Sequence, residues 1–136
     1  ENCEYTGIDI GESVGVDIVK SGHEFDAEDK SFNTIISCEC FEHNPFWKET
    51  FQNMIRMCKS KGLVIMTCAT TGRPEHGTTR SASFASPLTV EKGWDYYKNL
   101  TKKDFTDEFV FENLFSSYEF SVDDVAKDLY FYGIKK

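Results

Sequence analysis

Apolar residues in the first part of the chain form short runs separated by polar and glycine-containing segments. The runs cover residues 5–10, 16–19 and 34–38. The last run contains the consecutive pair Ile35-Ile36, and consecutive apolar residues are typical of strands covered on both faces, as in parallel sheets. We therefore expect these segments to be strands of a parallel sheet, with both faces of the strand at 34–38 buried.

The apolar residues change to a helical spacing after Pro45. Pro45 suits the first turn of a helix, where a missing N–H costs nothing, and Gly62 suits a left-handed C-cap. The run at 63–66 then predicts another buried strand, so this part of the chain should form a right-handed βαβ crossover. The apolar stripe of the helix consists of Trp47, Phe51, Met54, Ile55 and Cys58.

A polar segment follows at residues 69–87. A loop of about twenty residues is uncommon in a compact domain and is usually functional or mobile. Beyond it, Thr101 and Asp104 resemble a capping box, which predicts a helix that runs to about Leu114.

The last two apolar runs, residues 118–122 and 129–134, are predicted strands. The acidic link between them is short, and a short link permits antiparallel pairing but no parallel crossover. The pattern as a whole predicts an α/β domain whose sheet is parallel first and ends in an antiparallel hairpin.

Composition narrows the function. The 136 residues fit one domain, and the 40% hydrophobic content predicts an ordered core. The net charge of −8 disfavours nucleic-acid binding, which depends on cations that meet phosphates. No apolar run approaches the roughly 20 residues that span a bilayer, and no signal-peptide pattern opens the chain. We therefore expect a soluble cytoplasmic protein with no membrane or nucleic-acid partner.

The five cysteines form an odd set. Cys58 and Cys68 fall in apolar runs, which favours buried free thiols in a reducing compartment over a disulfide framework. Cys38, Cys40 and His43 suggest zinc, but their spacing lacks a paired C-x-x-C motif and no second ligand cluster follows. The sequence therefore predicts no metal site.

Asp9 ends the first predicted strand. A carboxylate at the mouth of a buried strand can accept two hydrogen bonds from the vicinal hydroxyls of a ribose, so Asp9 predicts a nucleoside-cofactor crevice. The alternative is a solvated carboxylate at the end of a strand. No glycine-rich strand-to-helix turn precedes Asp9, although such a turn normally completes the crevice.

The ordered segments YTGIDI, SFNTIISCECFEH, KGLVIMTCA, GRPEHG, YYKNLTKKDF and DLYFYGIKK carry a family resemblance. From Tyr5 onward the chain resembles class I S-adenosylmethionine-dependent methyltransferases of the small type 11-like kind. The resemblance implies a single domain over residues 1–136 with a Rossmann-like sheet, mostly parallel, with an antiparallel C-terminal hairpin and S-adenosylmethionine as cofactor. A nicotinamide-dependent dehydrogenase, the more distant reading, would normally continue with parallel strands.

By this resemblance, Asp9 holds the ribose hydroxyls and Ile10 packs on the adenine face. The place where the family often has an acid for the adenine amino group holds Ser21 here, so backbone groups of the next two residues are expected to contact the ring instead. Cys38, which ends the strand at 34–38, and Glu39 after it face the methionine part of the cofactor. The implied cofactor-binding residues are Asp9, Ile10, Ser21, Gly22, His23, Cys38 and Glu39.

Acceptor recognition is assigned to the segments that follow. His43 is the candidate catalytic residue, because an imidazole can orient or deprotonate an acceptor, and helix capping is the alternative. The candidate cations and aromatic residues could bind a carboxylate, a phosphate or a sugar, whereas surface solvation and packing explain them equally well. The implied substrate-binding residues are Arg73, His76, Arg80, Trp94, Tyr96 and Tyr97.

The family's first strand and helix, with their glycine-rich loop, have no counterpart ahead of Tyr5, and the chain opens at Glu1 as a fragment or a trimmed product would. An unpaired edge beside residues 5–10 invites association. We therefore expect either a homo-oligomer or a longer polypeptide whose preceding segment supplies the strand.

Two functions follow from these observations. The first is methyl transfer from S-adenosylmethionine to a small-molecule or glycan acceptor. The second is a non-catalytic or incomplete methyltransferase-like domain that serves as a binding or scaffold module.

Overall fold

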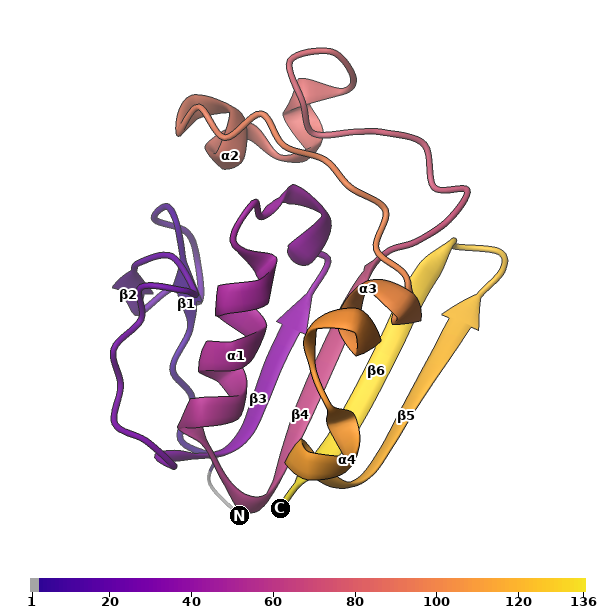
Figure 1. Cartoon of the computed structure of the whole chain (residues 1–136). Helices are drawn as coiled ribbons and strands as arrows, with labels where there is room; N and C mark the ends of the chain where they lie inside the picture. Colours follow the sequence, from indigo (N-terminus) through magenta and orange to yellow (C-terminus); the bar gives the residue numbers. More distant parts are fainter. Residues whose placement is uncertain (1–2) are drawn as a thin grey trace.

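The computed structural model describes residues 3–136, and Glu1 and Asn2 lie outside the described residues (Figure 1). Its strands are β1 (Ile8–Asp9), β2 (Ile18–Val19), β3 (Phe32–Cys38), β4 (Cys58–Ala69), β5 (Phe115–Asp123) and β6 (Asp128–Lys135). They form two sheets. β1 and β2 make a small parallel pair, and the larger sheet has the order β3-β4-β6-β5.

The predicted strand, helix and strand crossover is present. β3 pairs with β4 in parallel, with Ile36 opposite Ile65, and helix α1 (Trp47–Met57) connects the two strands. The helix begins at Trp47, later than predicted, and Pro45 lies ahead of its first residue. The Asn44 side chain accepts a hydrogen bond from the Phe46 N–H at 2.8 Å and forms the turn that precedes the helix.

The predicted C-cap at Gly62 is wrong. Helix α1 ends at Met57 and β4 begins at once, so Gly62 lies inside a strand. Lys61, with φ of 64°, adopts the left-handed conformation instead. A Cβ atom on Gly62 would lie 2.7 Å from the Asn33 carbonyl oxygen, so the glycine serves the close approach of β4 to β3.

The C-terminal hairpin is antiparallel, as predicted. β5 pairs with β6, with Phe120 opposite Phe131, and β6 in turn pairs antiparallel with β4. The Asp123 carboxylate accepts the N–H groups of Val125 and Ala126 in the connecting turn. The larger sheet is therefore mixed, as the apolar pattern predicted.

Helices cover one face of the larger sheet. Helices α1, α3 (Lys102–Glu108) and α4 (Phe111–Leu114) lie on the same side of it (Figure 1). In the aromatic core the Phe51 ring packs against the rings of Phe105, Phe111 and Phe131. The capping box of Thr101 and Asp104 is present at the start of α3. The predicted single helix is divided in two because Phe109 adopts an extended backbone. No helix among residues 3–136 is long and apolar enough to cross a membrane.

The opposite face of the larger sheet is uncovered in the described part of the chain. Ile36 on β3 is 59% exposed, and Val122, Tyr130 and Tyr132 on the hairpin are exposed as well. The prediction that both faces of the strand at 34–38 are buried is therefore wrong. A run of apolar residues marks a strand, but what covers each face depends on segments that pack from elsewhere.

Candidate functional site

A cleft of about 780 Å³ lies between β1 and β3. Within the described residues β1 pairs only with β2, and β3 only with β4, so the facing edges of the two sheets border this space. Its lining includes Thr50, Met54 and Met57 of α1, together with residues 87–89 of helix α2 (Pro87–Glu91). The volume is in the range of sites that bind small molecules and cofactors.

The strands of the cleft end at the same place and supply the predicted cofactor residues. Asp9 ends β1, Ser21 lies shortly after β2, and Cys38 ends β3. Ligands of open α/β sheets bind outside the carboxyl ends of the strands, so this geometry suits a cofactor. Six of the seven predicted cofactor residues line the cleft, namely Asp9, Ile10, Ser21, Gly22, Cys38 and Glu39.

Asp9 keeps acceptor capacity for a ligand. Its Oδ1 atom accepts a hydrogen bond from the Ile10 N–H at 2.6 Å, which fixes the carboxylate at the end of β1. A carboxylate has about four lone-pair sites, so the remaining ones can accept the two hydroxyls of a ribose.

Glu39 turns the chain at the end of β3. Its φ of 48° is left-handed, an uncommon conformation for a residue other than glycine, and its carboxylate accepts a hydrogen bond from the Thr67 hydroxyl at 2.7 Å. This contact holds the Glu39 side chain against β4, beside the cleft.

His23 is the predicted cofactor residue that does not line the cleft. Its ring stacks on Phe46, with ring centroids 4.1 Å apart, and its Nδ1 atom lies 2.7 Å from the buried Ser21 hydroxyl. The contact orients Ser21, which does line the cleft. His23 therefore contacts a predicted cofactor residue from outside the cleft.

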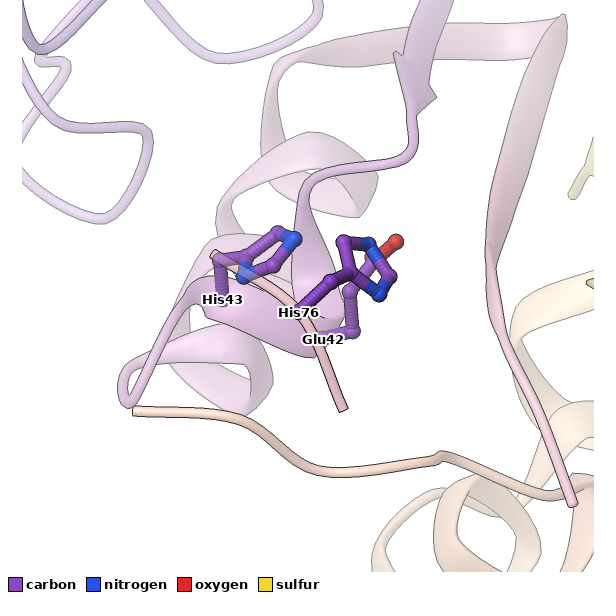
Figure 2. A group of neighbouring side chains, drawn as sticks. All are labelled: Glu42, His43 and His76. Atoms are coloured by element: carbon purple, nitrogen blue, oxygen red, sulfur yellow. The ribbon is translucent and has the colours of Figure 1, made fainter. Parts of the chain in front are cut away.

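His43 lines the cleft and lies next to a residue that the sequence analysis missed. Glu42 and His43 belong to the short turn η1 (Phe41–His43), and both are buried. Their donor atoms, with those of His76, lie within 4.8 Å of one another (Figure 2). The signal available in the sequence was the adjacent pair Glu42-His43, a carboxyl group next to an imidazole.

Burial sets the protonation of this cluster. It raises the pKa of the Glu42 carboxyl to about 7, with a further contribution from the charge of Glu39. Burial also lowers the pKa of His43 to about 4, and the neighbouring His76 adds to the shift. The His43 ring is therefore uncharged at neutral pH. Its Nδ1 atom has no hydrogen-bond partner among residues 3–136, so His43 does not cap helix α1 through that atom.

The predicted substrate aromatics separate into two groups. Trp94 lines the cleft, whereas Tyr96 and Tyr97 do not. The Tyr97 ring packs against His43 and His76, with centroid distances of 5.5 and 5.0 Å, and burial raises its pKa to about 12. Tyr97 therefore belongs to the histidine cluster.

The two predicted substrate cations hold the polar loop in place. Arg73 donates to the Asp128 carboxylate of β6 at 2.7 Å, and Arg80 forms ion pairs with Glu75 and Asp95. Neither arginine lines the cleft. Their role as substrate ligands stays a prediction, and the contacts show a loop anchored at both of these points.

Comparisons with known proteins agree with the resemblance inferred from the sequence. A family model described as a methyltransferase domain matches residues 1–125. Among curated proteins, none matches the chain.

Solved structures with this fold include three methyltransferases. The 1,6-didemethyltoxoflavin N1-methyltransferase of Burkholderia thailandensis has a TM-score of 0.62 at 11% identity, over 96% of this chain and 60% of that one. An S-adenosylmethionine-dependent methyltransferase of Thermotoga maritima has a TM-score of 0.57 at 11% identity, over 90% and 65%. Phosphoethanolamine N-methyltransferase 2 of Haemonchus contortus has a TM-score of 0.55 at 14% identity, over 86% and 36%.

The chain thus spans less than two thirds of the length of each of these structures. At such identities the likeness concerns the fold. The first and the last of the three hold S-adenosylhomocysteine, which supports S-adenosylmethionine as the cofactor of this fold.

Proposed function

Because the chain belongs to the methyltransferase domain family, of the class I S-adenosylmethionine-dependent kind, we propose that it transfers a methyl group to a small-molecule or glycan acceptor. The observation that carries the proposal is the cleft at the strand ends. It gathers Asp9, Ser21 and Glu39 from three separate segments around one space. That is the arrangement a nucleoside cofactor requires in an open α/β sheet.

Methyl transfer depends more on how the protein positions the two reactants than on catalytic groups of the protein. The methyl carbon leaves the sulfonium sulfur, which keeps the electron pair of the broken bond, and joins a lone pair of the acceptor. Alignment of the two reactants supplies much of such a rate enhancement. In this proposal Asp9 and Ile10 hold the nucleoside, and Cys38 and Glu39 face the methionine part.

The acceptor would reach the methyl group beside His43 and Trp94, which line the same cleft. His43 is the proposed catalytic residue, either as an orienting group or as a base when the acceptor has to lose a proton. The names of two of the similar structures include small acceptors, 1,6-didemethyltoxoflavin and phosphomonomethylethanolamine, which supports a small acceptor here. A glycan remains within the same proposal.

One observation favours the second function, a binding or scaffold module without catalysis. The facing edges of β1 and β3 share no pairing within the described residues, and no glycine-rich turn precedes Asp9. A cofactor held by the described residues alone would lack the backbone contacts that such a turn provides.

Calorimetric titration with S-adenosylmethionine, S-adenosylhomocysteine and NAD distinguishes the two functions. We expect binding of the first two and none of NAD. Asp9→Asn should weaken binding about tenfold or more, because it removes a charged acceptor from two hydrogen bonds. Asp26→Asn is the control, since the Asp26 side chain is 85% exposed and, among the described residues, pairs only with Lys20. If none of the three ligands binds, the result would favour the scaffold function.

The same facing edges support a proposal about assembly. Unpaired strand edges are templates for another strand, which a second copy or a longer polypeptide can supply. Ile36, at 59% exposure on the adjoining strand, adds apolar surface to that edge. Light scattering should therefore find a dimer or a larger assembly of this chain, and a lone monomer at all concentrations would contradict association between copies.

A further inference from the structure

Glu42, His43 and His76 form a compact group of metal-ligating side chains. Each offers one donor atom, and these atoms lie within 4.8 Å of one another (Figure 2). Zinc bonds to histidine nitrogen and carboxylate oxygen measure about 2.0–2.2 Å, so movements of about 1 Å in each side chain bring all the donors onto one ion. No other such group is present among residues 3–136.

The carboxylate of this group lacks a partner. Glu42 is fully buried, and among residues 3–136 neither of its carboxylate oxygens has a hydrogen bond. Buried polar atoms in proteins are nearly always paired, and an unpaired buried carboxylate is especially unfavourable. A cation among the three side chains would satisfy the Glu42 carboxylate.

His76 is oriented in the way that metal-binding histidines are. Its Nδ1 atom lies 3.0 Å from the Pro74 carbonyl oxygen. A carbonyl only accepts, so Nδ1 carries the proton and the lone pair is on Nε2, free for an ion. A hydrogen bond from the second ring nitrogen to a carbonyl is the common support of metal-binding histidines. The Tyr97 hydroxyl lies 3.2 Å from the same carbonyl and donates to the Asn99 Oδ1 atom at 2.8 Å.

Gly77 lets the loop reach the turn. Its φ of 66° is left-handed, and a Cβ atom at this position would lie 2.7 Å from the Cε1 atom of His43. Only a residue without a side chain permits this approach. The backbone next to His76 is thereby held against His43, which places the two imidazoles at a centroid distance of 4.9 Å.

We propose that Glu42, His43 and His76 bind a divalent transition-metal ion, with zinc as the best match to the ligand set. Two imidazole nitrogens and one carboxylate oxygen are typical of zinc sites that keep a fourth position open. The same ligand set also suits iron(II). Titration with zinc as the probe tests the zinc assignment. Because His43 lines the cleft, a water molecule or an acceptor oxygen in the cleft can occupy the open position.

This site differs from the cysteine set considered in the sequence. Cys38 and Cys40 are not members of it, and the expectation of no metal site is replaced by this proposal. A metal on a ring nitrogen of His43 also excludes that nitrogen as a base. The inference is independent of methyl transfer, because metal binding is measured with no cofactor present.

The test is calorimetric titration of the whole chain with zinc chloride after removal of metals by a chelator, supported by the visible absorption of the cobalt(II) form. We expect one ion per chain. His76→Gln and Glu42→Gln should each weaken zinc binding by at least about tenfold. His23→Gln is the matched control, since His23 stacks on Phe46 outside the cluster. A Cys38→Ser, Cys40→Ser double variant controls for zinc held by the exposed thiols.

Each outcome decides the proposal. Unchanged zinc affinity in His23→Gln and in the double cysteine variant, with a loss in His76→Gln, supports it. His76 is on a partly exposed loop, so its variant tests the site even where Glu42→Gln disturbs folding. The proposal is overturned when the wild-type chain binds no zinc, when His76→Gln binds as tightly as His23→Gln, or when the cysteine variant alone loses the ion.

Discussion

Asp104 offers a sharp test of the energetics of α3. Its Oδ2 atom accepts the Thr101 N–H at 2.8 Å and the Thr101 hydroxyl at 2.7 Å, and its Oδ1 atom lies 2.6 Å from the Lys98 ammonium. Asp104→Asn keeps the shape of the side chain but removes its charge. Loss of the charged cap costs about 0.5–1 kcal/mol, and loss of the partly exposed ion pair costs a similar amount. The expected loss is therefore about 1–2 kcal/mol of unfolding free energy, or about 3–8 °C in Tm.

The effect should depend on pH with a definite sign. Burial opposes ionisation of Asp104, but the hydrogen bonds from Lys98 and Thr101 outweigh it and lower its pKa. A group with a lowered folded pKa stabilises the protein above its unfolded pKa of about 3.9, and this contribution is lost as the pH falls through the folded value. The difference between wild type and variant should thus be constant from about pH 7 to about pH 5 and should shrink below about pH 4.

Urea unfolding followed by circular dichroism measures both effects. Asp107→Asn is the matched control on the same helix. In the part of the chain that the structure describes, Asp107 pairs only with Lys103, and both side chains are more than half exposed. It should change the unfolding free energy by less than about 0.5 kcal/mol. Equal stability of Asp104→Asn and wild type at neutral pH, or a difference that does not change with pH, would refute the reasoning.

Substitutions at two positions of the polar loop, Gly77 and Arg73, test its contacts. Gly77→Ala should lower the unfolding free energy by more than the roughly 1 kcal/mol of left-handed strain, because the new Cβ also meets His43. Gly93→Ala is the control. The φ of Gly93 is also positive, but a Cβ atom there meets open space, so this substitution should cost only the strain. Thermal unfolding of the two variants checks this, and equal losses would contradict the clash. Arg73→Ala should cost about 1–3 kcal/mol in urea unfolding, because it leaves the buried Asp128 carboxylate without its cation, and Arg73→Lys should recover part of the loss.

The elements that could be predicted from the sequence are those fixed by local chemistry. The stripe of α1 follows from the spacing of Trp47, Phe51 and Met54, and all three are buried. The capping box needs only Thr101 and Asp104. The acidic link between the last two strands is too short for a parallel crossover, so it predicts an antiparallel hairpin. In each case the residues that decide the structure are close together in the chain, so distant contacts have little weight.

Features decided by distant contacts were predicted less well. The pair Lys61-Gly62 has the local signature of a helix C-cap, yet packing against the Asn33 carbonyl places Gly62 in a strand. The apolar residues of β3 predicted burial on both faces, but Ile36 is exposed because all the helices packed on the larger sheet lie on the other side. Likewise, no local signal joins His76 to Glu42, since their approach depends on how the polar loop is anchored.

That anchoring leads to a last prediction about the proposed metal site. Arg73 ties the start of the loop to β6. The Tyr97 hydroxyl donates to the Asn99 Oδ1 atom at 2.8 Å and lies 3.2 Å from the Pro74 carbonyl, the same carbonyl that fixes the His76 ring. The ring is therefore held in place before an ion arrives, which lowers the cost of ordering it on binding. Tyr97→Phe leaves all the donor atoms present and loosens only their support, so it should weaken zinc binding less than His76→Gln does. Equal losses in calorimetric titration of the two variants would mean that the loop's position, and no bond from His76 to the ion, controls the affinity.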